Sequence, residues 1–221
     1  AKRRMLHHQI AQSMEECLGD TLYHSKLLNE IAYHYKMSKQ PIKSLEYELH
    51  YLEANLQFPH ELFPIYSREF GFIETTEDNN QTAVLEQLDR IRQEIKDLES
   101  KHQNRKDFQL LVLRFFYLEG HYAIRTGNYQ QGMDNIQQVI ASAKELQQMD
   151  FLLEGYRQMI YYCIQTENIP EMRYYTELAL EASVQANNHE AIAINLRPKG
   201  LYYLMIGGEE QALQHLYQSL D

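Results

Sequence analysis

The stretch FQLLVLRFFYLEGHYAIRTGNYQQGMDNIQQVIASAKELQ, residues 108–147, decides the fold of this chain. Its first half carries an apolar face at helical spacing, formed by Leu110, Leu113, Phe116, Tyr117, Gly120, Ala123 and Ile124. Its second half carries another, formed by Tyr129, Gly132, Met133, Ile136, Val139, Ile140 and Ala143. Between them, Gly127 suits the end of one helix and Asn128 suits the cap of the next. The stretch therefore predicts a helical hairpin.

The hairpin pattern returns twice more at one constant step along the chain. Five columns keep this step: Gly132, Met172 and Ala212; Gly127, Glu167 and Gly207; Gly120, Ile160 and Gly200; Tyr122, Tyr162 and Tyr202; Ile136, Thr176 and Leu216. Small residues near helix crossings, with an aromatic neighbour, are typical of tetratricopeptide-type repeats, here with longer helices than usual. We therefore expect an all-α, right-handed superhelical solenoid of tetratricopeptide-like helical hairpins, with about 11 helices.

The expected organisation is one repeat domain over residues 1–221. It consists of a leading helix over 1–19 and helical hairpins over 20–57, 58–104, 105–148, 149–188 and 189–221. A short helix near 65–73 is expected within the least regular part. Pro198 lies inside a helical pattern, lacks an N–H and disfavours helix at Arg197, so we expect a kink or break there. Because a helical pattern still runs at Asp221, we expect a fragment of a larger protein.

Composition narrows the function classes. The net charge is −10, from 21 basic and 31 acidic residues, which argues against nonspecific nucleic-acid binding. No apolar run approaches the roughly 18 residues that span a membrane, and no signal peptide opens the chain. Cys17 and Cys163 lie far apart within helical patterns and are expected to be reduced core thiols. These features predict a cytoplasmic protein that contacts neither nucleic acid nor membrane directly.

The first sixty residues resemble a known junction. The segments RRMLHHQIAQSMEE and LLNEIAYHYKMSKQPIKSLEYELHYLE are similar to the region after the ATPase module in bacterial signal-transduction ATPases, including transcription activators of the maltose-regulator type. The matching positions are Arg3, Arg4, Leu6, His7, Ile10, Ala11, Ile31, Ala32, His34, Tyr35, Lys43, Ser44, Leu45, Glu46 and Tyr47. Lys39-Gln40 replaces a Gly-Asp turn, and Ser44 replaces an alanine. The resemblance implies a regulatory context and no chemistry.

Catalytic and metal motifs are missing from the sequence. It contains no HExxH, no Cys/His cluster, no GxSxG and no GxxxxGK[ST]. Adjacent carboxylates such as Glu15-Glu16 point in different directions on a helix, and general acid–base pairs need convergence. Tyr122, Tyr162 and Tyr202 fit either a ladder that stacks on a ligand or packing between repeats, and we favour the packing. We therefore expect no enzyme activity, no cofactor and no metal.

A candidate binding groove remains. In repeats of this kind the first helix of each pair lines the concave face, which predicts a ligand-binding set of Arg114, Tyr117, His121, Arg125, Arg157, Tyr161 and Arg197. Guanidinium groups gathered there would suit a protein or peptide partner, possibly acidic, because arginine binds carboxylates in bidentate fashion. The favoured function is a protein-, peptide- or effector-binding domain that acts on an absent ATPase or output domain of the same polypeptide. The alternative is a peptide-pheromone receptor domain of a quorum-sensing regulator.

Overall fold

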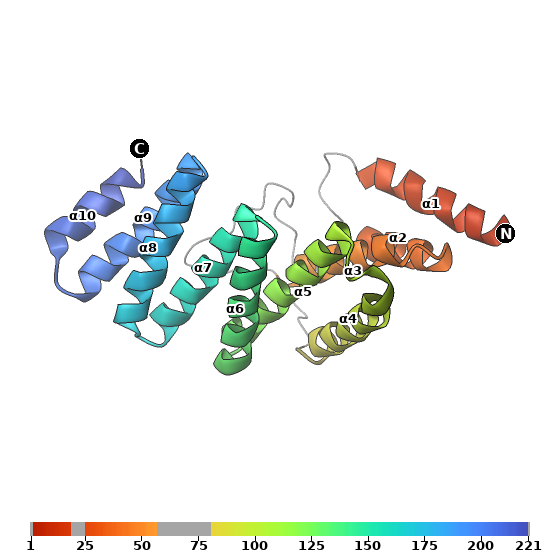
Figure 1. The fold of residues 1–221 in the computed structure, drawn as a ribbon, viewed down its shortest axis with the longest axis horizontal. Helices are drawn as coiled ribbons and strands as arrows, with labels where there is room; N and C mark the ends of the chain where they lie inside the picture. The colour runs from red at the N-terminus through yellow and green to blue at the C-terminus, as the bar shows by residue number, and fades with distance from the viewer. Residues whose placement is uncertain (1, 19–24, 57–80, 221) are drawn as a thin grey trace. The chain divides into compact units, whose positions relative to one another are not determined.

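The computed structural model describes residues 2–18, 25–56 and 81–220, and it is all-helical over them, without strands (Figure 1). The helices are α1 (Lys2–Leu18), α2 (Ser25–Met37), α3 (Pro41–Asn55), α4 (Gln81–His102), α5 (Lys106–Arg125), α6 (Tyr129–Glu145), α7 (Met149–Gln165), α8 (Ile169–Gln185), α9 (His189–Met205) and α10 (Glu209–Gln218). The all-α class is confirmed. The short helix expected near 65–73 lies outside the described residues, and the right-handed superhelix stays a prediction.

The chain divides into two compact units, residues 1–118 and 119–221. In the first unit α1 packs on α2, α2 on α3 and α3 on α4. In the second unit each helix from α6 to α9 packs on the next one along the chain. The boundary falls within α5, whose last turns contact α6. Each unit therefore has its own packing.

Two glycines bring α5 and α6 together. A Cβ atom on Gly120 would lie 2.8 Å from Cδ1 of Ile136, and one on Gly132 would lie 2.6 Å from Cγ1 of Ile124. The backbone N of Ile124 would be only 2.9 Å from that second Cβ. Real Cβ atoms do not approach other atoms this closely. Only glycine, which has no side chain, therefore fits at both positions. The two glycine columns are confirmed as helix crossings in this hairpin.

The last hairpin repeats the arrangement. A Cβ atom on Gly200 of α9 would lie 2.8 Å from Cγ of Leu216 and 3.2 Å from the carbonyl oxygen of Ala212. Ala212 itself is fully buried. The register read from the sequence therefore also places the α9–α10 crossing correctly.

The turns of the second unit share one backbone geometry. A positive φ angle recurs once per helix, at Gly127 (84°), Gln147 (54°), Glu167 (54°), Asn187 (50°) and Gly207 (80°). After each one, the next N–H bonds back to a carbonyl in the last turn of the helix, as from Asn128 to Ala123 at 2.8 Å. This is the Schellman arrangement, which satisfies carbonyls that a helix end leaves open. Every helix from α5 to α9 thus ends in the same way.

Two expectations about individual helices differ from the structure. Helix α9 continues from His189 to Met205 through Pro198, so a break there is wrong, and the alternative, a kink, stays a prediction. Proline removes one hydrogen bond, but α9 packs against both α8 and α10, and that packing holds the helical backbone on each side. The expected α5 face is also partly wrong. Leu110 and Phe116 are only half-buried, whereas Leu111, Phe115 and Leu118 are buried. Helix α5 is covered on nearly all sides, which an amphipathic pattern does not show.

The first prediction concerns the α5–α6 crossing. Gly132→Leu should lower the free energy of unfolding by about 1–3 kcal/mol, because the new side chain overlaps Ile124 and its backbone. Urea denaturation followed by circular dichroism measures this change. Gln138→Leu, at an exposed position of the same helix, is the matched control and should change stability little. Equal stability of Gly132→Leu and the parent would contradict the register.

The second prediction concerns the turns. Nothing lies within 4 Å of a Cβ atom built on Gly127, so Gly127→Ala tests the backbone angle alone. Alanine at positive φ should cost about 1 kcal/mol. Glu167→Gly, at the equivalent turn with φ of 54°, should instead gain about 0.5 kcal/mol. The same urea titrations should give opposite signs for the two variants, and equal signs would argue against the strain at these turns.

Candidate functional site

Arg114 and Arg157, both predicted to line the groove, are paired with carboxylates. Arg114 Nη2 lies 2.5 Å from Glu53 Oε2, and Arg157 Nη2 bonds to Glu154 one turn earlier in α7. Both pairs are partly shielded from solvent, with side-chain exposures between 16% and 25%. The repulsion expected among the guanidinium groups is therefore relieved at these two positions, and their demand for an external anion is smaller than the sequence suggested.

Arg125 has a different environment. Its Cζ atom lies 3.2 Å from the ring centre of Tyr161, a close cation–π contact between α5 and α7. Gln165 Nε2 donates to the Tyr161 hydroxyl at 2.6 Å, and the Tyr129 hydroxyl donates to Gln165 Oε1 at 3.2 Å. We name Arg125, Tyr129, Tyr161 and Gln165 the Tyr161 cluster. Side chains from three helices thus hold one another in place.

The remaining predicted residues are less accessible. Tyr117 is 6% exposed and His121 is 5% exposed, so neither presents much surface to a ligand. Arg197 is half-buried on α9. Arg114 and Tyr117 belong to the first unit, whereas the other five belong to the second. The structure brings Arg125 and Tyr161 together, with Arg157 one turn before Tyr161 on α7, and a groove through all seven stays a prediction.

The sequence interpretation missed the partners of Arg114. Glu53 is 61 residues away along the chain, and no spacing rule connects the two. His50 lies on the same helix as Glu53, with Nε2 3.5 Å from Arg114 Nη1. Burial, together with the positive charges of Arg114 and Lys43, lowers the pKa of His50 to about 3. This histidine is therefore neutral near pH 7 and can accept a hydrogen bond.

A second missed group is the carboxylate of Glu119, which is 4% exposed on α5. It accepts hydrogen bonds from Asn135 at 2.9 Å and from Gln131 at 3.4 Å, both on α6. Buried carboxylates need such donors, because desolvation of an unsatisfied charge is costly. Glu119 and its donors therefore tie the α5–α6 hairpin together by polar contacts beside the glycine crossing.

In the first unit, polar contacts attach α1 to its neighbours. The Glu15 carboxylate accepts hydrogen bonds from the hydroxyls of Tyr35 and Tyr47 and lies 3.3 Å from Lys43 Nζ. Burial raises the pKa of Glu15, but these tyrosine hydrogen bonds and the Lys43 charge together bring it below its ordinary value. His7 Nδ1 lies 2.9 Å from His34 Nδ1. Burial and the neighbouring His7 lower the pKa of His34.

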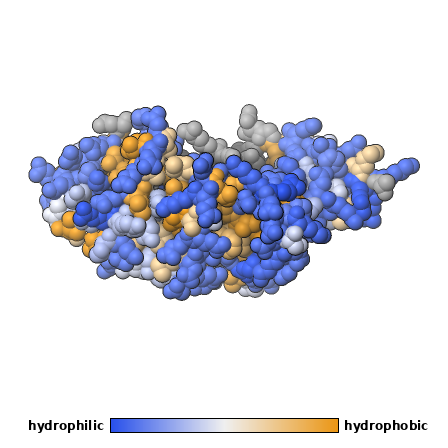
Figure 2. All heavy atoms as spheres, in the orientation of Figure 1, coloured by the Kyte–Doolittle hydropathy of each residue, from blue (hydrophilic) through white to orange (hydrophobic). Residues whose placement is uncertain are grey.

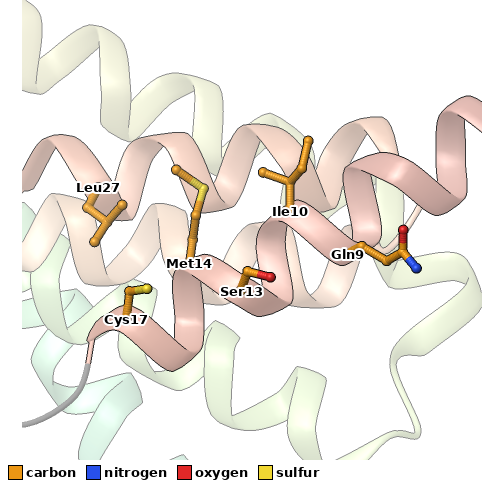
Figure 3. Close-up of a pocket in the computed structure, with 6 residues that line it drawn as sticks. All are labelled: Gln9, Ile10, Ser13, Met14, Cys17 and Leu27. Atoms are coloured by element: carbon orange, nitrogen blue, oxygen red, sulfur yellow. The ribbon is translucent and has the colours of Figure 1, made fainter.

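An apolar groove of about 430 Å³ runs along α1 (Figure 3). Five lining residues come from α1 and one from α2: Gln9, Ile10, Ser13, Met14, Cys17 and Leu27. Cys17 is exposed here, so its assignment as a core thiol was wrong. Periodicity alone could not separate the inner from the outer face, because α1 buries only Ala11 and Leu18.

Cys163 and the column tyrosines are placed differently. Cys163 is fully buried, and burial raises the pKa of its thiol to about 12, as expected of an inert core residue. Tyr122 is 8% exposed, and Tyr162 packs edge-on against Tyr129 with ring centres 5.5 Å apart. Tyr202 lies under the guanidinium of Arg173, on the preceding helix. At Tyr162 and Tyr202 these contacts join neighbouring helices, which agrees with the packing interpretation.

We next consider whether the described residues form a metal site or a membrane-spanning helix. Across residues 2–18, 25–56 and 81–220, no three His, Cys, Asp or Glu side chains gather as a metal site would require. None of the described helices is long and apolar enough to cross a membrane. Comparison of the chain with family models, with curated proteins and with solved structures gave no match.

The third prediction follows from His50. Its pKa is lowered in the folded state from an ordinary value of 6.5 to about 3, so only the unfolded chain takes up this proton between those values. The stability that neutral His50 contributes is therefore complete above about pH 6.5 and falls as the pH decreases toward 3, by at most about 1.4 kcal/mol per pH unit.

His50→Gln should reduce this loss, because glutamine cannot take up a proton. Urea midpoints at pH 7 and pH 5 measure the loss in each variant. His189→Gln, an exposed histidine at the start of α9, serves as the control and should behave like the parent. If His50→Gln loses as much stability as the parent on acidification, the burial of a neutral histidine is the wrong explanation.

Proposed function

We propose that this chain is a non-catalytic helical-repeat domain of a bacterial regulatory protein, and that it binds a protein or peptide through α7 and the Tyr161 cluster. Arg157, Tyr161 and Gln165 stand four residues apart along α7 and therefore share one face. Arg125 adds a second guanidinium beside that face. Arginine and tyrosine are among the side chains that most often dominate binding energy at protein interfaces.

The pre-ordering of the cluster is the observation that carries the proposal. The cation–π contact and the two hydrogen bonds fix side chains that would otherwise lose rotamer freedom on binding, so the entropic cost of association is reduced. The guanidinium groups of Arg125 and Arg157 bring positive charge to this face, beside the Glu154 carboxylate that Arg157 contacts. An acidic segment of a partner, or of an output domain of the same polypeptide, matches that charge.

The fourth prediction tests this binding. Heptapeptides selected from a random displayed library against the full chain should be rich in Asp and Glu. Arg157→Ala should weaken a selected peptide by about 1.5–3 kcal/mol, the scale of a charged hydrogen bond, and Arg157→Lys should recover only part of the loss. Isothermal titration calorimetry measures both, and circular dichroism verifies that the fold is kept.

Arg173→Ala is the matched control, since Arg173 is an exposed arginine on α8 paired with Glu177. It should leave the peptide affinity unchanged. A selection without enrichment, or binders that tolerate both Arg157→Ala and Tyr161→Ala, would show that this face is not a binding surface.

A further inference from the structure

Three large apolar side chains are exposed at the last described helix. Leu213 is 54% exposed, Tyr217 is 66% exposed and Leu220, in the turn directly after α10, is 76% exposed. Leu213 and Tyr217 stand four residues apart and share a face of α10. We name these three residues the α10 stripe. Figure 2 shows apolar surface among hydrophilic residues at this end of the second unit.

Residues at the same repeat positions in earlier hairpins contact the next helices along the chain. Arg173, which holds the position of Leu213 one repeat earlier, lies with its guanidinium 6.0 Å from the ring centre of Tyr202 on α9. Gln137, which holds the position of Tyr217 two repeats earlier, is hydrogen-bonded to the hydroxyl of Tyr175 on α8. Both positions therefore face forward, toward the hairpin that follows.

The third position shows the closest contact. Ile140, which holds the position of Leu220 two repeats earlier, is 9% exposed, and its Cγ1 would lie 2.7 Å from a Cβ atom on Gly155 of α7. A small residue in the following helix thus lets the two helices approach closely over this isoleucine. At α8 a forward contact is polar, because Asn195 on α9 donates to Ser183 at 3.0 Å.

We propose that the α10 stripe docks a helical hairpin of this chain's own repeat type, in the register in which α9 and α10 follow α8. All three exposed side chains occupy positions that face the next hairpin elsewhere in the second unit, so the docked hairpin continues an interface already present twice. The hairpin presents a small residue opposite Leu220, as Gly155 does for Ile140, and aromatic side chains opposite Leu213 and Tyr217.

The physical reason is the burial of apolar surface. In α6 and α8 the forward positions hold mixed side chains, such as Gln137, Arg173 and Glu177, which tolerate water at their edges. In α10 the same positions hold leucine and tyrosine. Contiguous exposed apolar side chains of this kind typically mark an interaction site, and a helix that packs over them removes that surface from water. This surface is distinct from the Tyr161 cluster and does not depend on the proposed peptide binding.

The test supplies such a hairpin in the correct register. Asp221 occupies the position that Ala141 holds two repeats earlier, so the sequence of residues 142–188 is appended directly after Asp221. This extension completes α10 and adds copies of α7 and α8. Hydrogen exchange followed by mass spectrometry should show α10 amides exchanging at least about tenfold more slowly in the extended chain than in the parent, because neighbouring repeats stabilise one another. The melting temperature should rise as well.

Tyr217→Lys with Leu220→Lys is the decisive variant. In the parent both positions are exposed, so the fold and the α10 exchange rates should remain unchanged. In the extended chain the same change should remove the added protection. Phenylalanine in place of the appended glycine that corresponds to Gly155 should do so too, by overpacking the contact from the other side.

Two results would overturn the proposal. The appended hairpin could give no protection of α10, or protection that survives both sets of substitutions. Alternatively, sedimentation could show that the parent chain self-associates and that Tyr217→Lys with Leu220→Lys abolishes this. In that case a second copy, and not a repeat-type hairpin, occupies the stripe.

Discussion

The closest packing constraint in the second unit is the crossing of α5 and α6, where two glycines meet two isoleucines. Gly120 faces Ile136, and Gly132 faces Ile124, with no room for a methyl group at either glycine. Such a crossing fixes how far one helix can slide along the other, because a shift would drive a side chain into backbone. Because the turns and the helices that follow have the same lengths, the later helices pack in the same register.

The turns explain how the register is passed on. Each helix from α5 to α9 ends at a residue with positive φ, and these residues are evenly spaced along the chain. A constant helix length and an identical turn return every helix to the same relation with its predecessor. Glycine occupies this position at two of the five turns, and Gln147 and Glu167 accept the strained angle. The repeat is therefore kept by geometry even where the sequence departs from the favoured residue.

Much of this could be predicted from the sequence. The hairpin starts predicted at residues 149 and 189 agree with the starts of α7 at Met149 and α9 at His189, since apolar period and turn residues are local signals. Side-chain partners were not predictable. The pair of Arg114 and Glu53 joins α5 to α3, and the stacking of Arg125 on Tyr161 joins α5 to α7. Such partners are far apart in the sequence, and only the packing of the helices brings them together.

In the first unit, the packing of α1 could not be predicted from the repeat pattern. Helix α1 buries only Ala11 and Leu18 and packs Met14 against the same core, and further attachments are polar, through Glu15 and the histidines His7 and His8. Part of this polar attachment depends on charge, because Glu15 accepts the hydrogen bonds of Tyr35 and Tyr47 as a carboxylate. Apolar periodicity, the signal that revealed the repeats, gives no information about these polar attachments of α1.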